Sequence, residues 1–209
     1  AFAHNWSGPV GRITRGLLLG AGFLMLGAWR ITTQVHQGAI LTVLGSTTIL
    51  ITTYAARELY GFFTPLSALS LMFLSIAFVA YVSVRFSNRN LALSGLILAA
   101  IAPEFTLAGT PDVIVLFAYL SIVVTGTLWV VYLRSWSILT FAALVIVFRH
   151  GMPYLVDWYY ASDTDIALLY AFFFTAVFFI ANIFGLMANA REGNRVPHIL
   201  IAIGTGLYL

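Results

Sequence analysis

Residues 113–133 read VIVLFAYLSIVVTGTLWVVYL, an unbroken run that contains no charged side chain. A helix of about 20 apolar residues is long enough to cross the roughly 30 Å hydrocarbon core of a bilayer. Apolar residues follow one another without a regular polar alternation, which disfavours the strand of a membrane β-barrel. The stretch therefore predicts a transmembrane helix, and similar runs recur along the chain.

The composition places the whole chain in the membrane class. Of its 209 residues, 61% are hydrophobic and 8% are charged, whereas an average soluble domain carries about 25% charged residues. So few charges cannot cover a globular surface in water, which excludes a soluble protein. All ten basic residues are Arg, the net charge is only +3, and there is no Cys. Nucleic-acid binding, disulfides and thiolate chemistry are therefore not expected.

We expect about eight transmembrane helices, arranged as successive hairpins in a single all-α polytopic domain. The predicted helices cover residues 13–29, 38–56, 66–84, 91–102, 113–133, 136–148, 166–188 and 196 onward. The fourth and sixth are short for a bilayer, so they are either tilted within the bundle or extend into their flanks. Pro103 is expected to end the fourth helix, because proline lacks the backbone N–H that a helix needs.

The arginines predict the orientation of the chain in the membrane. Connections that carry Arg30, Arg85, Arg89, Arg134, Arg191 and Arg195 hold one acid, Glu192, whereas the opposite set holds four Arg and six acids. Excess Arg marks the cytoplasmic side, so we expect residue 1 on the outer side of a bacterial inner membrane. Residue 1 is Ala and the last apolar run is short, which predicts a segment of a longer multi-pass chain.

Several turns resemble those of one bacterial family. They are residues 5–12 (NWSGPVGR), 54–61 (YAARELYG) before Thr64-Pro65, 85–95 (RFSNRNLALSG), Ala102-Pro103, 117–120 (FAYL) and Arg134-Ser135-Trp136. Together they resemble the predicted membrane proteins called domain of unknown function 2339, over about residues 5–150. Ala99 and Ala100 stand where that family has two glycines. The resemblance implies a longer multi-pass protein, and it supplies no activity, cofactor or catalytic residue.

The second helix offers one candidate polar site. Thr42, Ser46, Thr53 and Arg57 are spaced to share one helix face, and Glu58 follows Arg57. Such a stripe could line a path for a polar solute. Alternatively, Ser and Thr bond back to their own helix or join it to a neighbour, which is the commoner use.

The acids of the outer side offer weaker candidates. Glu104 either accepts a proton or cation near the surface, or it is an interfacial carboxylate beyond the end of its helix. Asp163 and Asp165 form a D-x-D pair that could hold a divalent ion, as in glycan enzymes, but they equally suit the start of a helix. We expect no specific metal and no cofactor. His150 and Asp157 could form an acid–base pair in the connection that follows Arg149, although a single His beside an Arg is more often an interfacial residue.

Two further patterns predict packing and membrane anchoring. Gly16 and Gly20 form a G-x-x-x-G face for close approach of a neighbouring helix. An aromatic belt at the outer surface is predicted from Tyr154, Trp158, Tyr159 and Tyr160, and the phenylalanines at 172–174, 178 and 179 are expected to face lipid or another helix.

Three functions remain open from the sequence. The first is a non-enzymatic scaffold or accessory subunit whose partners are the bilayer and other membrane helices. The second is a transporter or flippase-like protein for an envelope polar lipid or sugar, based on the stripe of the second helix and the broken fourth helix. The third is an envelope glycan enzyme that uses the outer acids.

Overall fold

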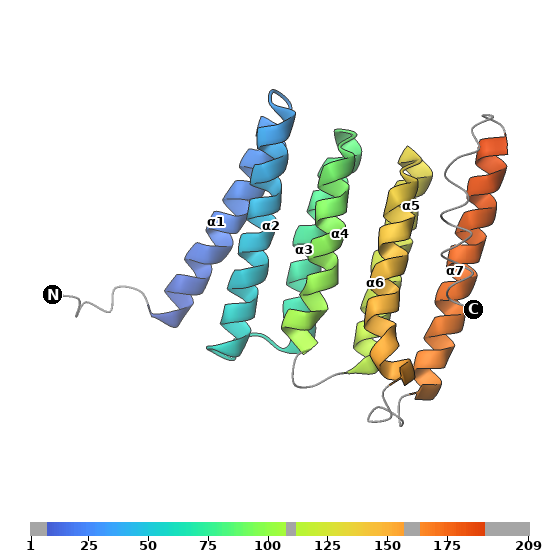
Figure 1. The fold of residues 1–209 in the computed structure, drawn as a ribbon. Helices are drawn as coiled ribbons and strands as arrows, with labels where there is room; N and C mark the ends of the chain where they lie inside the picture. Colours follow the sequence, from blue (N-terminus) through green and yellow to red (C-terminus); the bar gives the residue numbers. More distant parts are fainter. Residues whose placement is uncertain (1–7, 108–111, 157–163, 191–209) are drawn as a thin grey trace. The chain divides into compact units, whose positions relative to one another are not determined.

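A computed structural model describes residues 8–107, 112–156 and 164–190, and these residues form seven α-helices with no strand among them. Figure 1 shows the helices in chain order. They are α1 (Pro9–Arg30), α2 (Val35–Glu58), α3 (Pro65–Arg85), α4 (Arg89–Leu107), α5 (Val113–Arg134), α6 (Ser137–Val156) and α7 (Thr164–Ala190). All but α4 are long and apolar enough to cross a membrane. The all-α class is confirmed, and the predicted eighth helix lies outside the described residues.

The chain divides into two compact units. Unit 1 is Ala1–Thr110 and contains α1 to α4, and unit 2 is Pro111–Leu209 and contains α5 to α7.

The predicted ends of the fourth and sixth helices are wrong. Pro103 lies inside α4, which continues to Leu107, and Pro153 lies inside α6, which continues to Val156. A proline removes one helix hydrogen bond, whereas ending a helix at membrane depth leaves several backbone groups without partners in hydrocarbon. The helices therefore continue through their prolines, and the alternative that they extend into their flanks is confirmed.

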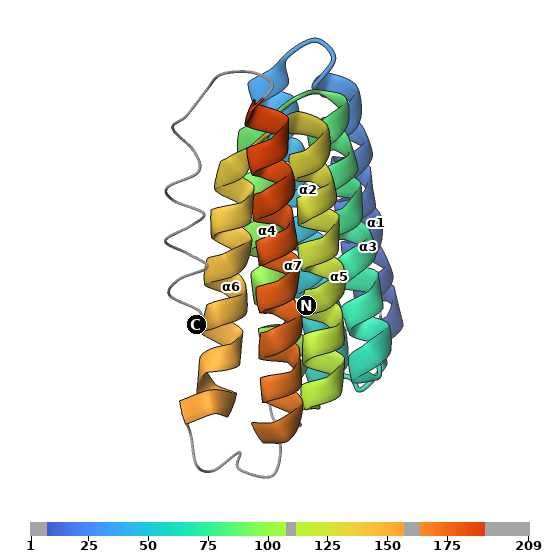
Figure 2. The same ribbon diagram turned by 90° about the vertical axis from the view of Figure 1, so that its right-hand side faces the viewer.

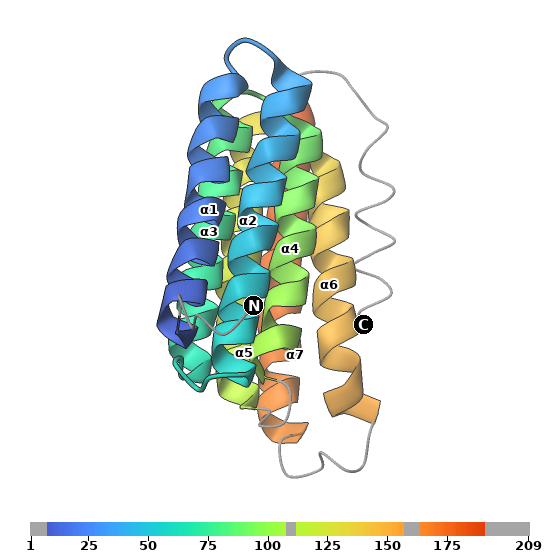
Figure 3. The same cartoon turned by 90° about the vertical axis from the view of Figure 1, so that its left-hand side faces the viewer.

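In unit 1, α1 and α2 form an antiparallel hairpin (Figure 3), in which the two helices pack closely. A Cβ on Gly20 of α1 would lie 2.6 Å from Ile49 Cγ1, and one on Gly16 would lie 2.6 Å from the Thr52 side chain. On α2, a Cβ on Gly45 would lie 2.6 Å from the backbone nitrogen of Leu24. The predicted close-packing face of Gly16 and Gly20 is confirmed, and α2 is its partner.

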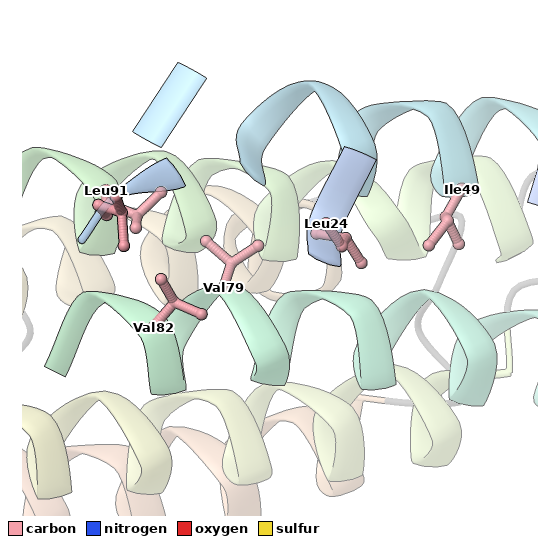
Figure 4. Packing of buried hydrophobic residues seen from close by; sticks show 6 residues of the cluster. Leu24, Ile49, Val79, Val82 and Leu91 are labelled. Atoms are coloured by element: carbon pink, nitrogen blue, oxygen red, sulfur yellow. The ribbon is translucent and has the colours of Figure 1, made fainter. Parts of the chain in front are cut away.

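A buried cluster joins the hairpin to the next two helices. It consists of Leu24, Ile31, Ile49, Val79, Val82 and Leu91, contributed by α1, α2, α3, α4 and the turn after α1. Figure 4 shows residues of this cluster from close by and labels all of them except Ile31. Phe86, in the turn between α3 and α4, packs against the same cluster. The turn after α1 and the turn after α3 therefore lie at the same end of unit 1.

Unit 2 consists of α5, α6 and α7, which pack against one another (Figure 2). Aromatic side chains make contacts between these helices. The ring of Phe117 on α5 lies 4.9 Å from Tyr170 of α7 and 5.7 Å from Tyr154 of α6, measured between ring centroids. Phe174 and Phe178 of α7 are buried, and Phe172, Phe173 and Phe179 are exposed. One face of α7 therefore packs against neighbouring helices, and its other face is exposed, where it is available to lipid or to another helix.

Candidate functional site

The predicted polar face of α2 lies inside unit 1. Thr42, Ser46 and Thr53 have no exposed surface, and the Arg57 side chain is 13% exposed. Their spacing of four and seven residues along α2 places them on one side of the helix. The four side chains therefore share a face, as predicted, and this face is turned toward neighbouring helices.

The first two members of this face make packing contacts. The hydroxyl of Thr42 donates to the Gly38 carbonyl one turn earlier, at 2.8 Å. The Ser46 hydroxyl lies 3.1 Å from the hydroxyl of Ser75 on α3, and Ser75 donates in turn to the Met72 carbonyl at 2.8 Å. Hydroxyls in membrane helices commonly bond in these two ways. These contacts support the packing interpretation over a solute path.

Arg57 connects the end of α2 to the end of α4. Its Nη1 donates to the carbonyl oxygen of Phe105 at 3.1 Å and lies 3.4 Å from Oε1 of Glu58. Phe105 belongs to the last turn of α4, where carbonyls have no partner within the helix. The guanidinium therefore satisfies a helix-end carbonyl and adds a cation at the negative end of the α4 dipole.

An aromatic contact joins the same two helix ends. We call this region the α2–α4 junction, and it consists of Tyr54, Arg57 and Glu58 of α2 with Phe105 of α4. The rings of Tyr54 and Phe105 lie 4.9 Å apart between centroids.

Gly61, at a φ of 63°, follows the last turn of α2. Its N–H donates to the Arg57 carbonyl, and the N–H of Phe62 donates to the Ala56 carbonyl. This is the left-handed helix ending that favours glycine. It explains the final glycine of the YAARELYG segment.

Thr53, one turn before Arg57, is buried at this level of the helix. Its hydroxyl oxygen has no hydrogen-bond partner among the residues that the structure describes. Leaving a buried hydroxyl without a partner costs about 1–3 kcal/mol. Nothing in the described part of the chain explains why a hydroxyl without a partner is buried at this position.

Two of the predicted acids, Glu104 and Asp165, are described, and each lies at a helix end. Glu104 is exposed in the last turn of α4. It was expected near a helix end, and it lies near one, although the helix ends at Leu107 and not at Pro103. Asp165 is exposed in the first turn of α7, where a carboxylate is favoured by the helix dipole. Asp157 and Asp163 lie outside the described residues. Within those residues, no three His, Asp or Glu side chains form a group able to hold a metal ion.

The connection predicted to begin at Arg149 begins later. Arg149 and His150 lie within α6, and His150 is buried with its Nδ1 2.9 Å from the Ile146 carbonyl oxygen. Tyr154 also belongs to α6 and is buried against Phe117. Its assignment to an outer aromatic belt is therefore wrong, because the helix continues past Pro153 and turns this ring into unit 2. Trp158, Tyr159 and Tyr160 lie outside the described residues.

The family of the chain follows from a comparison with protein-family models. The model described as "Predicted membrane protein (DUF2339)" matches residues 1–208. The chain belongs to this family. The resemblance seen in separate turns over residues 5–150 thus extends over nearly the whole chain. No curated protein and no solved structure matches it.

Membership of the DUF2339 family identifies an integral membrane protein of uncharacterised function. The site residues must therefore be interpreted from their own contacts. Sequence analysis missed Ser75 and Phe105, the partners of Ser46 and Arg57. The first is one of several serines in α3, and the second contributes a backbone carbonyl, which no side-chain pattern reveals.

Proposed function

We propose that this DUF2339 chain is a non-enzymatic scaffold or accessory subunit of a complex in a bacterial inner membrane. The observation that carries the proposal is the use of the polar face of α2. Thr42 bonds within its helix, Ser46 contacts α3 and Arg57 contacts α4. Groups that bind a transported solute need a cavity, whereas Thr42 has a partner within α2, and Ser46 and Arg57 join α2 to its neighbours.

The outward faces of α1 and α7 support an assembly role. In each of these spans, 17% of the residues are buried. Large side chains point away from the described chain, among them Leu18 and Met25 on α1 and Phe172 on α7. Leu18 and Met25 are seven residues apart and share a helix face. These faces provide broad apolar surfaces on which helices of a complex can pack.

The proposed orientation follows from the arginines. Arg30, Arg85 and Arg134 each end a helix or begin the turn after it. By the excess of Arg in these connections, they lie in the cytoplasm and residue 1 lies outside. Glu58 and Glu104 then lie toward the outer surface.

A thiol-accessibility experiment tests the assignment of the α2 face. The chain has no native cysteine, so Thr42→Cys introduces a single thiol at a fully buried position. In membranes that contain the full-length protein, a small water-soluble maleimide is expected to leave this thiol unmodified. Ser87→Cys, at an exposed position in the turn after α3, is the matched control and is expected to react in opened membranes. Rapid modification of Thr42→Cys would support the transporter alternative instead.

Photo-cross-linking tests the assembly role itself. A benzophenone amino acid is placed at Leu18 or Met25 of α1, or at Phe172 of α7, in cells that make the full-length protein. We expect both α1 positions to capture the same membrane polypeptide, because they share a face. The same variants irradiated after dilution into detergent are the control. Adducts with lipid alone at all three positions contradict a scaffold.

A further inference from the structure

Three arginines gather at one end of unit 1. Arg30 ends α1, Arg85 ends α3 and Arg89 begins α4. Ile31 follows Arg30, Phe86 follows Arg85, and Leu91 is two residues after Arg89. Ile31 and Leu91 belong to one buried cluster, and Phe86 packs against it. The two turns are therefore neighbours, as Figure 1 also shows. We call Arg30, Arg85 and Arg89 the arginine end.

Among the described residues of unit 1, no carboxylate lies at the arginine end. Residues 1–110 contain two acids, Glu58 and Glu104. Glu58 is the last residue of α2 and Glu104 is in the last turn of α4, so both lie at the opposite end of this up-and-down unit. All three arginines are exposed. Their positive charge is thus not balanced by any acid of unit 1 at that end.

The contacts described for these side chains are with uncharged groups. Arg30 Nη2 donates to Oε1 of Gln34 at 3.4 Å, and the Arg85 guanidinium lies 5.7 Å from the centroid of the Phe86 ring. Such contacts orient a guanidinium and leave its charge intact. Each arginine can therefore still attract an anion.

The turn between Arg85 and Arg89 is held by the backbone and Asn88. The N–H of Asn88 donates to the Ser83 carbonyl at 2.9 Å, and Oδ1 of Asn88 accepts from the N–H of Leu91 at 3.1 Å. Ser87 occupies the left-handed region, with φ 52°. The turn therefore holds the backbones of Arg85 and Arg89, four residues apart in sequence, in one arrangement.

Two large aromatic side chains lie next to the arginines on the membrane side. Trp29 precedes Arg30 and is 71% exposed, and Tyr81, one turn before Arg85, is 65% exposed. Trp and Tyr prefer the headgroup level of a bilayer. The arginine end is consequently at the depth of lipid phosphates, with apolar helix surface extending into the acyl chains.

We propose that the arginine end binds the phosphate of an anionic phospholipid in the adjacent leaflet. Guanidinium groups match phosphate oxygens with paired N–H donors. A free phosphate shares this chemistry, but the exposed Trp29 and Tyr81 favour a ligand that also has acyl chains. The proposal does not depend on the scaffold role and would hold for any function of the chain.

Native mass spectrometry of the detergent-solubilised full-length protein tests this site. The protein is titrated with phosphatidylglycerol or with phosphatidylcholine of the same acyl chains, and the apparent Kd of the first bound lipid is measured. We expect tighter binding of phosphatidylglycerol. A charge near an anionic lipid surface contributes about fivefold in affinity, so Arg85→Gln with Arg89→Gln is expected to weaken that binding about 25-fold.

The matched control removes two exposed arginines from the other end of unit 1. Arg12→Gln with Arg15→Gln is expected to change the Kd by less than threefold. Arg85→Lys with Arg89→Lys keeps the charges but loses the paired N–H donors, so its affinity is expected to lie between those of the unmodified protein and the glutamine variant. Melting temperatures of the lipid-free variants identify any folding defect. If one occurs, a titration of the unmodified protein at a higher ammonium acetate concentration should still show weakened binding, because salt screens the charges.

Three results overturn the proposal. One is equal loss of phosphatidylglycerol binding in the two glutamine double variants, which indicates charge attraction without a site. Another is equal affinity for phosphatidylcholine. The third is displacement of the lipid by millimolar inorganic phosphate or glycerol phosphate, which identifies a site for a free phosphate.

Discussion

Replacing Gly45 by Ala should separate α1 from α2 and destabilise unit 1. A Cβ at position 45 would lie 2.6 Å from the backbone nitrogen of Leu24 and 2.7 Å from the carbonyl oxygen of Gly20. Both atoms belong to the α1 backbone, so no side-chain rotation can relieve the overlap. The helices must move apart by several tenths of an ångström or more, which weakens dispersion contacts along the whole interface.

The expected size of the effect follows from two opposing terms. Overpacking a close contact costs about 1–3 kcal/mol, and the backbone position of this clash places it at the upper end. Alanine is favoured over glycine within a helix by about 1 kcal/mol, which offsets part of the loss. A net loss of about 2 kcal/mol corresponds to a fall of about 4–8 °C in melting temperature for a chain of this size.

Gly22→Ala is the matched control on the same hairpin. Its Cβ would have no neighbouring atom within 4 Å, so only the gain in helix propensity remains and the melting temperature should stay equal or rise. Thermal unfolding of the detergent-solubilised protein, followed by Trp fluorescence, measures both variants. The close-packing argument fails if Gly45→Ala melts no lower than Gly22→Ala.

Four other predictions concern the remaining site residues. Gly20→Leu should lower the melting temperature more than Gly20→Ala, because the Ile49 side chain can yield to one methyl group but not to an isobutyl group; equal melting temperatures would contradict this. Arg57→Gln should cost about 1–3 kcal/mol by removing a charged hydrogen bond to the Phe105 carbonyl, and unchanged thermal unfolding would mean that the contact has no energetic value. In intact cells, an impermeant thiol reagent should label Ser162→Cys and should not label Ser87→Cys; the reverse pattern would invert the proposed topology. Asp163→Asn with Asp165→Asn should leave membrane insertion and any cellular phenotype intact, whereas a stoichiometric divalent ion at this pair would favour the glycan-enzyme alternative.

The sequence was sufficient for the fold class and for most helices, because long apolar runs have few alternatives in a bilayer. It was also sufficient for the existence of a glycine packing face, since Gly16 and Gly20 are one turn apart. It could not identify which helix packs against this glycine face. Thr52, Ile49 and Gly45 of α2 are ordinary residues until the two helices meet.

Pro103 made the fourth helix appear to end too early, for a physical reason. Proline is a helix-ending signal in soluble proteins, where water can bond the freed carbonyl groups. In hydrocarbon the comparison changes, because a helix that ends early leaves more groups without partners than a proline does. As a result, Glu104 lies within the last turn of α4, and His150 and Tyr154, which were expected in the connection after Arg149, lie within α6.

The α2 face shows why polar residues in a membrane helix do not by themselves indicate a transport path. A bilayer contributes little hydrophobic attraction between helices, so hydroxyls and a charged side chain can supply specific contacts instead. Ser46 contacts a hydroxyl of α3, and Arg57 contacts a backbone carbonyl of α4. Each contact links α2 to a different neighbour. Thr42, Ser46 and Thr53 are fully buried, so a solute could reach this face only if the helices that cover it moved apart. A transport function would therefore require unit 1 to rearrange, and the accessibility of Thr42→Cys would report that rearrangement directly.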